Sequence, residues 1–141
     1  MNRRDKYYII VNVDNGKTEK VNGSFGLAEN FEVHEFVTQD DQEIVLYSKR
    51  HVDLLQAIRD FYQKPLTITS GNRMIEFNDS LPNSSSNSEH LHGYATDIKI
   101  QGVTPLELWH KCVLFGGYKC NVGLYEKHVH FGTMGYHRRA R

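Results

Sequence analysis

Residues 88–97 read SEHLHGYATD, and residues 128–130 read HVH. We interpret these two segments as the two parts of one metal site, with His90, Asp97 and His130 as the ligands. Two imidazoles and one carboxylate suit a catalytic zinc ion, because three protein ligands leave the fourth tetrahedral position open for water. A closed structural site more often has four ligands and uses cysteine, and this chain contains only two cysteines.

The alternation of side chains predicts that two of these ligands lie on β-strands. In ATDIKI, residues 95–100, Asp97 is on the face opposite the apolar isoleucines. In HVHF, residues 128–131, the two histidines share one face and the apolar residues point into a core. Gly93 favours a turn that brings His90 towards the first strand.

The length and charge of the chain exclude several classes of function. A chain of 141 residues is expected to form one domain, residues 1–141, that buries a core without disulfides. Its 17 basic and 17 acidic residues give zero formal net charge, so no overall field favours nucleic acid or a membrane surface. No segment approaches the ~20 apolar residues of a transmembrane helix, and the start lacks a signal-peptide pattern. We therefore expect a monomer made in the cytoplasm, with no nucleic-acid partner.

The order of predicted elements indicates an α+β fold, a small antiparallel sheet with flanking helices that carries the site. Residues 1–22 form a predicted N-terminal hairpin, with Asn15-Gly16 at its turn. Apolar residues at three- and four-residue steps predict a helix from Lys49 to Gln63, and Thr104-Pro105 predicts the start of a second helix. Extended segments are predicted at residues 31–36, 43–47, 66–69, 95–100, 118–125 and 128–131.

Three segments carry a resemblance to a known family: KPLTITSGxR in residues 64–73, NSxHLxGxAxDI in residues 87–98, and GG…VGLYE…VH in residues 116–130. They resemble the zinc D-Ala-D-Ala carboxypeptidases, a family that includes phage endolysin peptidases and shares its fold with the hedgehog signalling domain. The resemblance covers residues 31–139. It implies a hedgehog/DD-peptidase-like core to which the N-terminal hairpin is added, with Zn²⁺ as the cofactor.

The resemblance also implies a role for each matching position. His90, Asp97 and His130 match the zinc ligands of the family. Arg73 matches an arginine that holds a carbonyl or carboxylate of the substrate. Ser88 matches a serine that hydrogen-bonds the substrate or orients the first ligand.

The residue that transfers the proton is left open by the resemblance. Glu126, ahead of the last ligand, is the candidate general base. His128 is a candidate for polarising the carbonyl or stabilising the tetrahedral intermediate, and a purely structural role is its alternative. Many relatives read Val-His-x-Asp, whereas this chain has Gly132 at the aspartate position and Asn72 where relatives have tyrosine. If that aspartate is the base in this branch, activity requires Glu126 or His128 to replace it.

The leading functional hypothesis is zinc-dependent hydrolysis of an amide bond in a peptidoglycan stem peptide, by a carboxypeptidase or an endopeptidase. Its setting would be lysis or remodelling of the cell wall, as for an endolysin released by a holin. The alternative is a weakly active or inactive zinc-containing module that binds cell-wall peptide or a protein partner, which Gly132 would permit. A third hypothesis is an iron(II) oxygenase triad. The long spacing from His90 to Asp97 and the lack of a jelly-roll run of strands argue against it.

Overall fold

The structure, a computed structural model, describes residues 2–73 and 89–137 of the chain. Ser88, the predicted substrate-binding serine, lies outside the described residues. The strands are β1 (Tyr7–Asn12), β2 (Lys17–Asn22), β3 (Gly26–Ala28), β4 (Phe31–Glu32), β5 (Ile44–Tyr47), β6 (Leu66–Ser70), β7 (Ala95–Ile100), β8 (Asn121–Leu124) and β9 (Val129–Gly132). The α-helices are α1 (Lys49–Tyr62) and α3 (Pro105–Gly116), and the 3-10 helices are η1 (Val33–Phe36) and η2 (Met134–His137).

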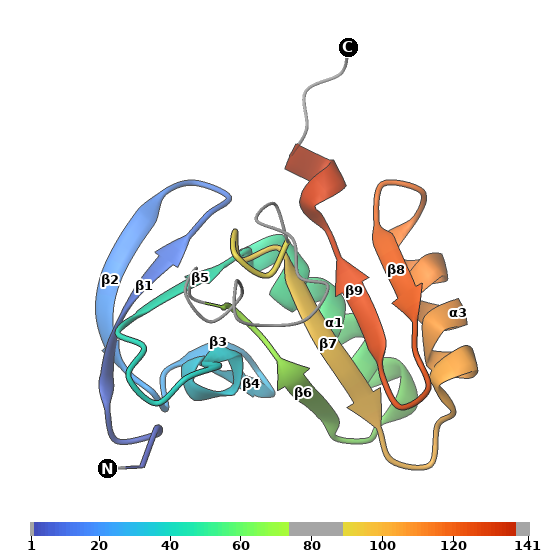
Figure 1. The fold of residues 1–141 in the computed structure, drawn as a ribbon, viewed down its shortest axis with the longest axis horizontal. Helices are drawn as coiled ribbons and strands as arrows, with labels where there is room; N and C mark the ends of the chain where they lie inside the picture. The colour runs from blue at the N-terminus through green and yellow to red at the C-terminus, as the bar shows by residue number, and fades with distance from the viewer. Residues whose placement is uncertain (1, 74–88, 138–141) are drawn as a thin grey trace.

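The predicted N-terminal hairpin is present, and it belongs to a larger sheet. β1 and β2 pair antiparallel around Gly16, whose φ of 77° suits the turn. β5 then adds to the other edge of β1 in parallel, so the strand order is β2-β1-β5. This sheet stands at the left of Figure 1.

The extended segment predicted at residues 31–36 is only partly correct. β4 ends at Glu32, and residues 33–36 form the 3-10 helix η1 instead. Val33 and Phe36 are both buried. Residues three apart lie on the same side of a 3-10 helix, so this turn buries both side chains where a strand would send them to opposite faces.

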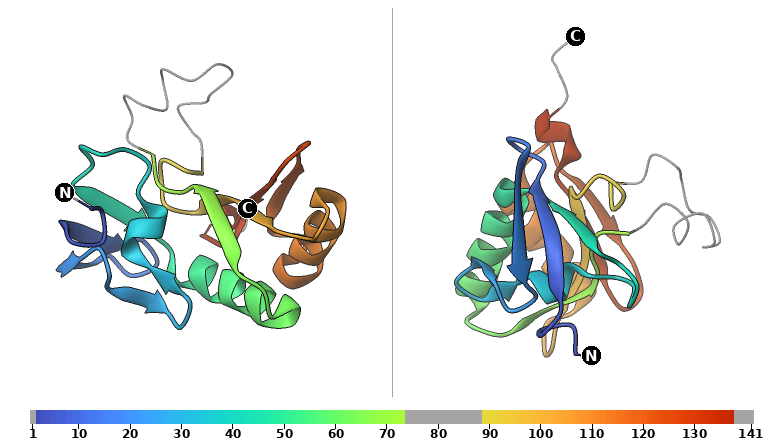
Figure 2. Two further views of the ribbon diagram at one scale, coloured as in Figure 1. Left: turned by 90° about the horizontal axis from the view of Figure 1, so that it is seen from below. Right: turned by 90° about the vertical axis from the view of Figure 1, so that its left-hand side faces the viewer.

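The site lies on an antiparallel sheet with the strand order β6-β7-β9-β8. α1 and α3 pack against one face of this sheet (Figures 1 and 2), which confirms the α+β class. Both of these α-helices begin at a side-chain cap, because Ser48 accepts the His51 N–H and Thr104 accepts the Glu107 N–H. α1 ends at Tyr62, one residue before the predicted end, because Gln63 adopts the left-handed conformation. No helix in the described ranges is long and apolar enough to cross a membrane.

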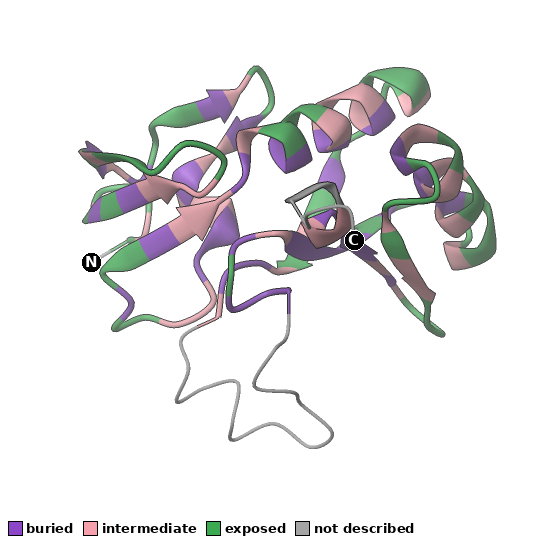
Figure 3. Ribbon diagram, turned by 90° about the horizontal axis from the view of Figure 1, so that it is seen from above, coloured by how far each residue is buried: buried purple, intermediate pink, exposed green. Residues whose placement is uncertain are grey.

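The core lies between the helices and the inner face of this sheet. Ile98 on β7 and Val129 and Phe131 on β9 are fully buried there, together with Leu55 of α1 and Leu108 of α3. Burying a side chain of this size contributes about 1.5–3 kcal/mol. Figure 3 shows the resulting pattern of buried residues along the inner sides of the helices and along β7. Because the apolar residues take the inner face, the alternating polar residues are left on the outer face, where the site forms.

Candidate metal centre

The ladder between β7 and β9 brings two of the predicted ligands together. Asp97 and His130 are directly paired in the register of these strands, so both side chains point to the outer face. His90 reaches the same place from the turn before β7. This turn requires Gly93, which has a φ of 79° and whose backbone packs so closely against Leu46 that a Cβ would collide with it.

The three ligand atoms form an equilateral triangle. His90 Nε2, His130 Nδ1 and Asp97 Oδ1 are each 3.2 Å from the other two. A tetrahedral zinc ion with bonds of about 2.0–2.1 Å separates its ligand atoms by roughly 3.3 Å. The spacing and the donor set therefore fit a zinc ion with one position left open.

The nitrogen of each histidine ring that faces away from the triangle has its own acceptor. His90 Nδ1 lies 2.8 Å from the Gly71 carbonyl oxygen, which can only accept a hydrogen bond. His130 Nε2 lies 3.3 Å from Oε1 of Glu89. Such partners hold the proton on the outer nitrogen and leave the lone pair of the other nitrogen for a metal.

The second oxygen of Asp97 faces two cationic or titratable groups. Arg73 Nη2 lies 3.5 Å from Oδ2 of Asp97, and His128 Nε2 lies 3.9 Å from the same oxygen. The arginine side chain is only 15% exposed. One oxygen of the carboxylate therefore points to the metal position, and the other faces groups from the loop after β6 and from the residue before β9.

The charges of the site stabilise one another. Burial alone would raise the pKa of Asp97, but the hydrogen bonds with His130 and His90 outweigh it and hold that pKa well below its usual range. Burial would lower the pKa of His130, but Asp97 and Glu89 raise it to about 9. For Glu89, burial again opposes ionisation, and hydrogen bonds from His130, Met134 and Asn121 lower its pKa. Both carboxylates are therefore ionised at neutral pH.

A comparison with protein-family models matches residues 18–132 to the family described as Peptidase M15. The match runs from β2 to the end of β9 and includes the whole ligand triangle. The chain belongs to the M15 peptidase family. Searches of curated proteins and of solved structures found no match. Members of the M15 family are zinc-dependent peptidases, so His90, Asp97 and His130 are the group that could hold the metal. The match begins at residue 18, earlier than the resemblance at residue 31.

Arg73, which the resemblance assigned to substrate binding, lies beside Asp97 at the M15 site. Its backbone N–H donates to the His90 carbonyl oxygen at 3.2 Å, and its Nε donates to Ser70 Oγ at 3.2 Å. These contacts aim the guanidinium group at Asp97. The loop after β6 therefore supports the first ligand and supplies the arginine at the same time.

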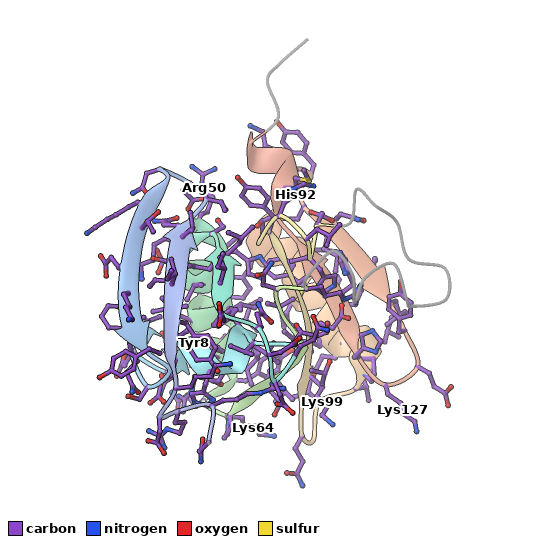
Figure 4. The ribbon with its side chains drawn as sticks, turned by 60° about the vertical axis from the view of Figure 1, so that its left-hand side comes forward. Tyr8, Arg50, Lys64, His92, Lys99 and Lys127 are labelled. Carbon is purple, nitrogen blue, oxygen red and sulfur yellow. The ribbon has the colours of Figure 1, made fainter. Side chains whose placement is uncertain are left out.

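The two candidates for proton transfer occupy different places. His128 immediately precedes β9, is half-buried, and stacks on Tyr125 with ring centroids 4.6 Å apart and an interplanar angle of 7°. Glu126 is exposed in the turn between β8 and β9 and has no hydrogen bond or ion pair with the described residues. His92, left out of the ligand set, is also exposed (Figure 4).

Two residues that support the M15 site were not predicted. Asn72 is 5% exposed and donates from Nδ2 to the His90 carbonyl oxygen at 2.9 Å. Glu89 is 9% exposed and contacts His130. The sequence feature that could have indicated the position of Glu89 is Gly132, because a glycine there leaves room for another side chain beside His130.

His51, which is not among the predicted site residues, is buried behind the M15 site. Its Nε2 lies 2.8 Å from Thr96 Oγ1 on β7, and its Nδ1 lies 3.1 Å from Thr133 Oγ1 after β9. Burial lowers the pKa of His51 to about 3, so the ring is neutral. It therefore joins α1 to both ligand-bearing strands without adding charge.

Proposed function

We propose that this M15 peptidase hydrolyses an amide bond in a peptidoglycan stem peptide and acts on the cell wall. The observation that supports the proposal best is the triangle of ligand atoms 3.2 Å apart, with Arg73 and His128 beside it. His90, Asp97 and His130 would hold a zinc ion, which would supply the Lewis acidity needed to activate water and polarise the scissile carbonyl.

In this proposal Arg73 places the substrate. Its guanidinium group is largely buried and close to Asp97 Oδ2, so it is poorly screened by solvent and fixed in direction. A planar guanidinium pairs well with a carbonyl or carboxylate oxygen. Arg73 would hold such an oxygen and stabilise the negative charge that develops on it in the transition state.

His128 would carry the proton. The ring is half-buried, is oriented by its stack on Tyr125, and presents Nε2 towards the ligand triangle. A neutral imidazole in this position can take a proton from water and return it to the leaving amine. Glu126 remains the second candidate, and a movement of the β8–β9 turn would have to bring its carboxylate to the site.

A pocket beside His128 supports an acidic peptide as the substrate. It has a volume of about 330 Å³, and Lys99 and Lys127 line it together with apolar residues of β7 and α3. Both lysines are exposed and lie at the same end of the sheet (Figure 4). They would attract the D-Glu side chain or a C-terminal carboxylate of a stem peptide.

Digestion of purified peptidoglycan tests this function. The protein is incubated with zinc, with a chelator, or with zinc restored after chelation, and the released fragments are identified by mass spectrometry. We expect cleavage that the chelator stops and zinc restores, and the fragment masses then name the bond. A His90→Ala variant serves as the inactive control.

The second candidate, a module that binds without cutting, rests on Gly132. It predicts stoichiometric zinc and sedimentation with insoluble peptidoglycan, but no released fragment. Metal analysis of the same sample also tests the iron oxygenase hypothesis, which requires iron in place of zinc.

A further inference from the structure

The Glu89 carboxylate gathers three hydrogen-bond donors from three elements. Oε1 lies 3.3 Å from His130 Nε2 on β9 and 3.0 Å from Asn121 Nδ2 on β8. Oε2 accepts the backbone N–H of Met134 in η2 at 2.9 Å. A buried carboxylate that meets three donors is held in one orientation.

Gly132 leaves the space that this carboxylate occupies. Position 132 is two residues after His130 on β9, so a side chain there would point to the same face as the ligand. A Cβ added at Gly132 would overlap both carboxylate oxygens of Glu89. The side chain of residue 132 and the side chain of Glu89 therefore compete for one volume beside His130.

We infer that Glu89 is the positioning residue of the ligand His130 and that it takes the place of the aspartate found in Val-His-x-Asp relatives. Gly132 is then the change that admits Glu89, and it does not imply that the site has lost its function. The inference rests on the metal site of the proposed function. It concerns how the ligand is held, and it is independent of which bond is cut.

The donor set explains why the residue is a carboxylate. His130 Nε2–H, Asn121 Nδ2–H and Met134 N–H all need acceptors, and an ionised carboxylate offers acceptors on both oxygens. A glutamine of the same shape would turn its NH₂ group towards at least one of these donors. The proton on His130 Nε2 would lose its partner or its geometry, and Nδ1 would be a less basic and less oriented ligand.

The test uses three variants of the full chain and one matched control. Glu89→Gln removes the second acceptor, and Gly132→Ala crowds the carboxylate. The double variant Glu89→Ala/Gly132→Asp moves the carboxylate to the strand. Glu35→Gln is the control, because it makes the same change at a half-buried carboxylate in η1, away from the ligands. Zinc affinity is measured by competition with a chromogenic chelator, and the protonated nitrogen of His130 is identified by ¹⁵N NMR. Circular dichroism establishes that each variant is folded.

We expect Glu89→Gln and Gly132→Ala each to weaken zinc binding by about 10–100-fold. The NMR signature of an Nε2-protonated, Nδ1-ligating His130 should be lost or broadened in both. The double variant should recover zinc affinity to within about tenfold of the wild type, while Glu35→Gln should not change it.

A folded Glu89→Gln variant with wild-type zinc affinity would overturn the inference. If the single variants do not fold, the double variant decides: recovered zinc affinity supports the exchange of carboxylates, and lost affinity contradicts it. Wild-type protein that binds no zinc would overturn both this inference and the proposed function. Wild-type protein that binds zinc but releases no peptidoglycan fragment would overturn the proposed function alone.

Discussion

The side-chain amide of Asn72 donates a hydrogen bond to the carbonyl oxygen of His90 at 2.9 Å. Oδ1 of the same side chain accepts from Gln42 Nε2 at 3.1 Å and from the Leu46 backbone N–H at 3.0 Å. Asn72 therefore connects the edge of β5 to the turn that carries His90. This network is one of the links between the N-terminal sheet and the metal site, beside the close packing of Gly93 against Leu46.

Replacing Asn72 with aspartate should destabilise the protein. The carboxylate keeps the two acceptor contacts, but it places a buried charge against the His90 carbonyl oxygen where a donor stood. We expect the free energy of unfolding to fall by about 1–3 kcal/mol, as measured by urea denaturation. Asn15→Asp is the control, because Asn15 only accepts a hydrogen bond, from the Lys17 N–H, and aspartate can do the same. Equal effects of the two substitutions would contradict this role of Asn72.

His90→Ala and His92→Ala should differ sharply in metal content. The first removes an atom of the ligand triangle, and the second removes an exposed ring two residues away. We expect zinc affinity to fall in His90→Ala by more than the ~10–100-fold that loss of an outer partner costs. Metal analysis after gel filtration measures this, and His92→Ala should retain the zinc content of the wild type. Zinc retained by His90→Ala would remove His90 from the ligand set.

Arg73→Lys should lower kcat without releasing zinc. Lysine keeps the charge but loses the planar fork that pairs with an oxygen of the substrate and with Asp97. We expect a loss of roughly 10²-fold, in line with the removal of one donor to a developing oxyanion. Arg4→Lys, at an exposed ion pair with Glu32, is the matched control. The role assigned to Arg73 fails if both variants hydrolyse the peptide at the same rate.

His128→Gln and Glu126→Gln separate the two candidates for the general base. We expect kcat to fall by about 10²–10⁴-fold in His128→Gln, because the proton acceptor is lost. Glu126→Gln should stay near the wild-type rate, since Glu126 is exposed in the β8–β9 turn. The value of kcat is measured for both variants with the same peptide and the same zinc concentration. The reverse result would assign the role to Glu126.

His51 should make the protein less stable in mild acid. Its pKa is about 3 in the folded state and near 6.5 when unfolded, so the unfolded state binds the proton first as the pH falls. The stabilisation of the folded state by the neutral His51 ring is complete above pH 6.5. As the pH falls from 6.5 towards 3, the free energy of unfolding decreases by about 1.4 kcal/mol for each pH unit.

Urea denaturation of wild type and His51→Gln between pH 8 and pH 5 measures this effect. The difference in the free energy of unfolding between wild type and His51→Gln should decrease below pH 6.5, because glutamine does not titrate. An exposed His110→Gln variant should follow the wild-type curve. A constant difference between wild type and His51→Gln across this range would contradict the argument.

Much of the fold was predictable because its signals are local. The alternation in residues 95–100 predicted β7 and the direction of Asp97, although Ala95 and Asp97 on the outer face are buried as well and only Lys99 there is exposed. The helix start at Thr104 and the turn at Gly16 lie where the sequence indicated. The segment at residues 33–36 was misjudged because two apolar residues three positions apart suit a 3-10 turn as well as an irregular strand.

The candidate site was predictable only in part, because only some of its residues lie in local sequence motifs. Arg73 and the three ligands lie in short motifs with recognisable spacing. Asn72 and Glu89 are single polar residues beside those motifs, and nothing in their immediate neighbours shows what they contact. Their roles depend on the distance at which β5, β8 and η2 approach the ligand loop.

The sequence by itself predicted both α-helices, most of the strands, the candidate ligands and the family, because the motifs that indicate them are made of side chains within a few positions of one another. Only the tertiary structure decided that β5 pairs with β1 and that Glu89 holds His130 in the space left by Gly132. Glu89 and His130 are 41 positions apart. A contact at that separation is set by how the strands pack, and local periodicity carries no information about it.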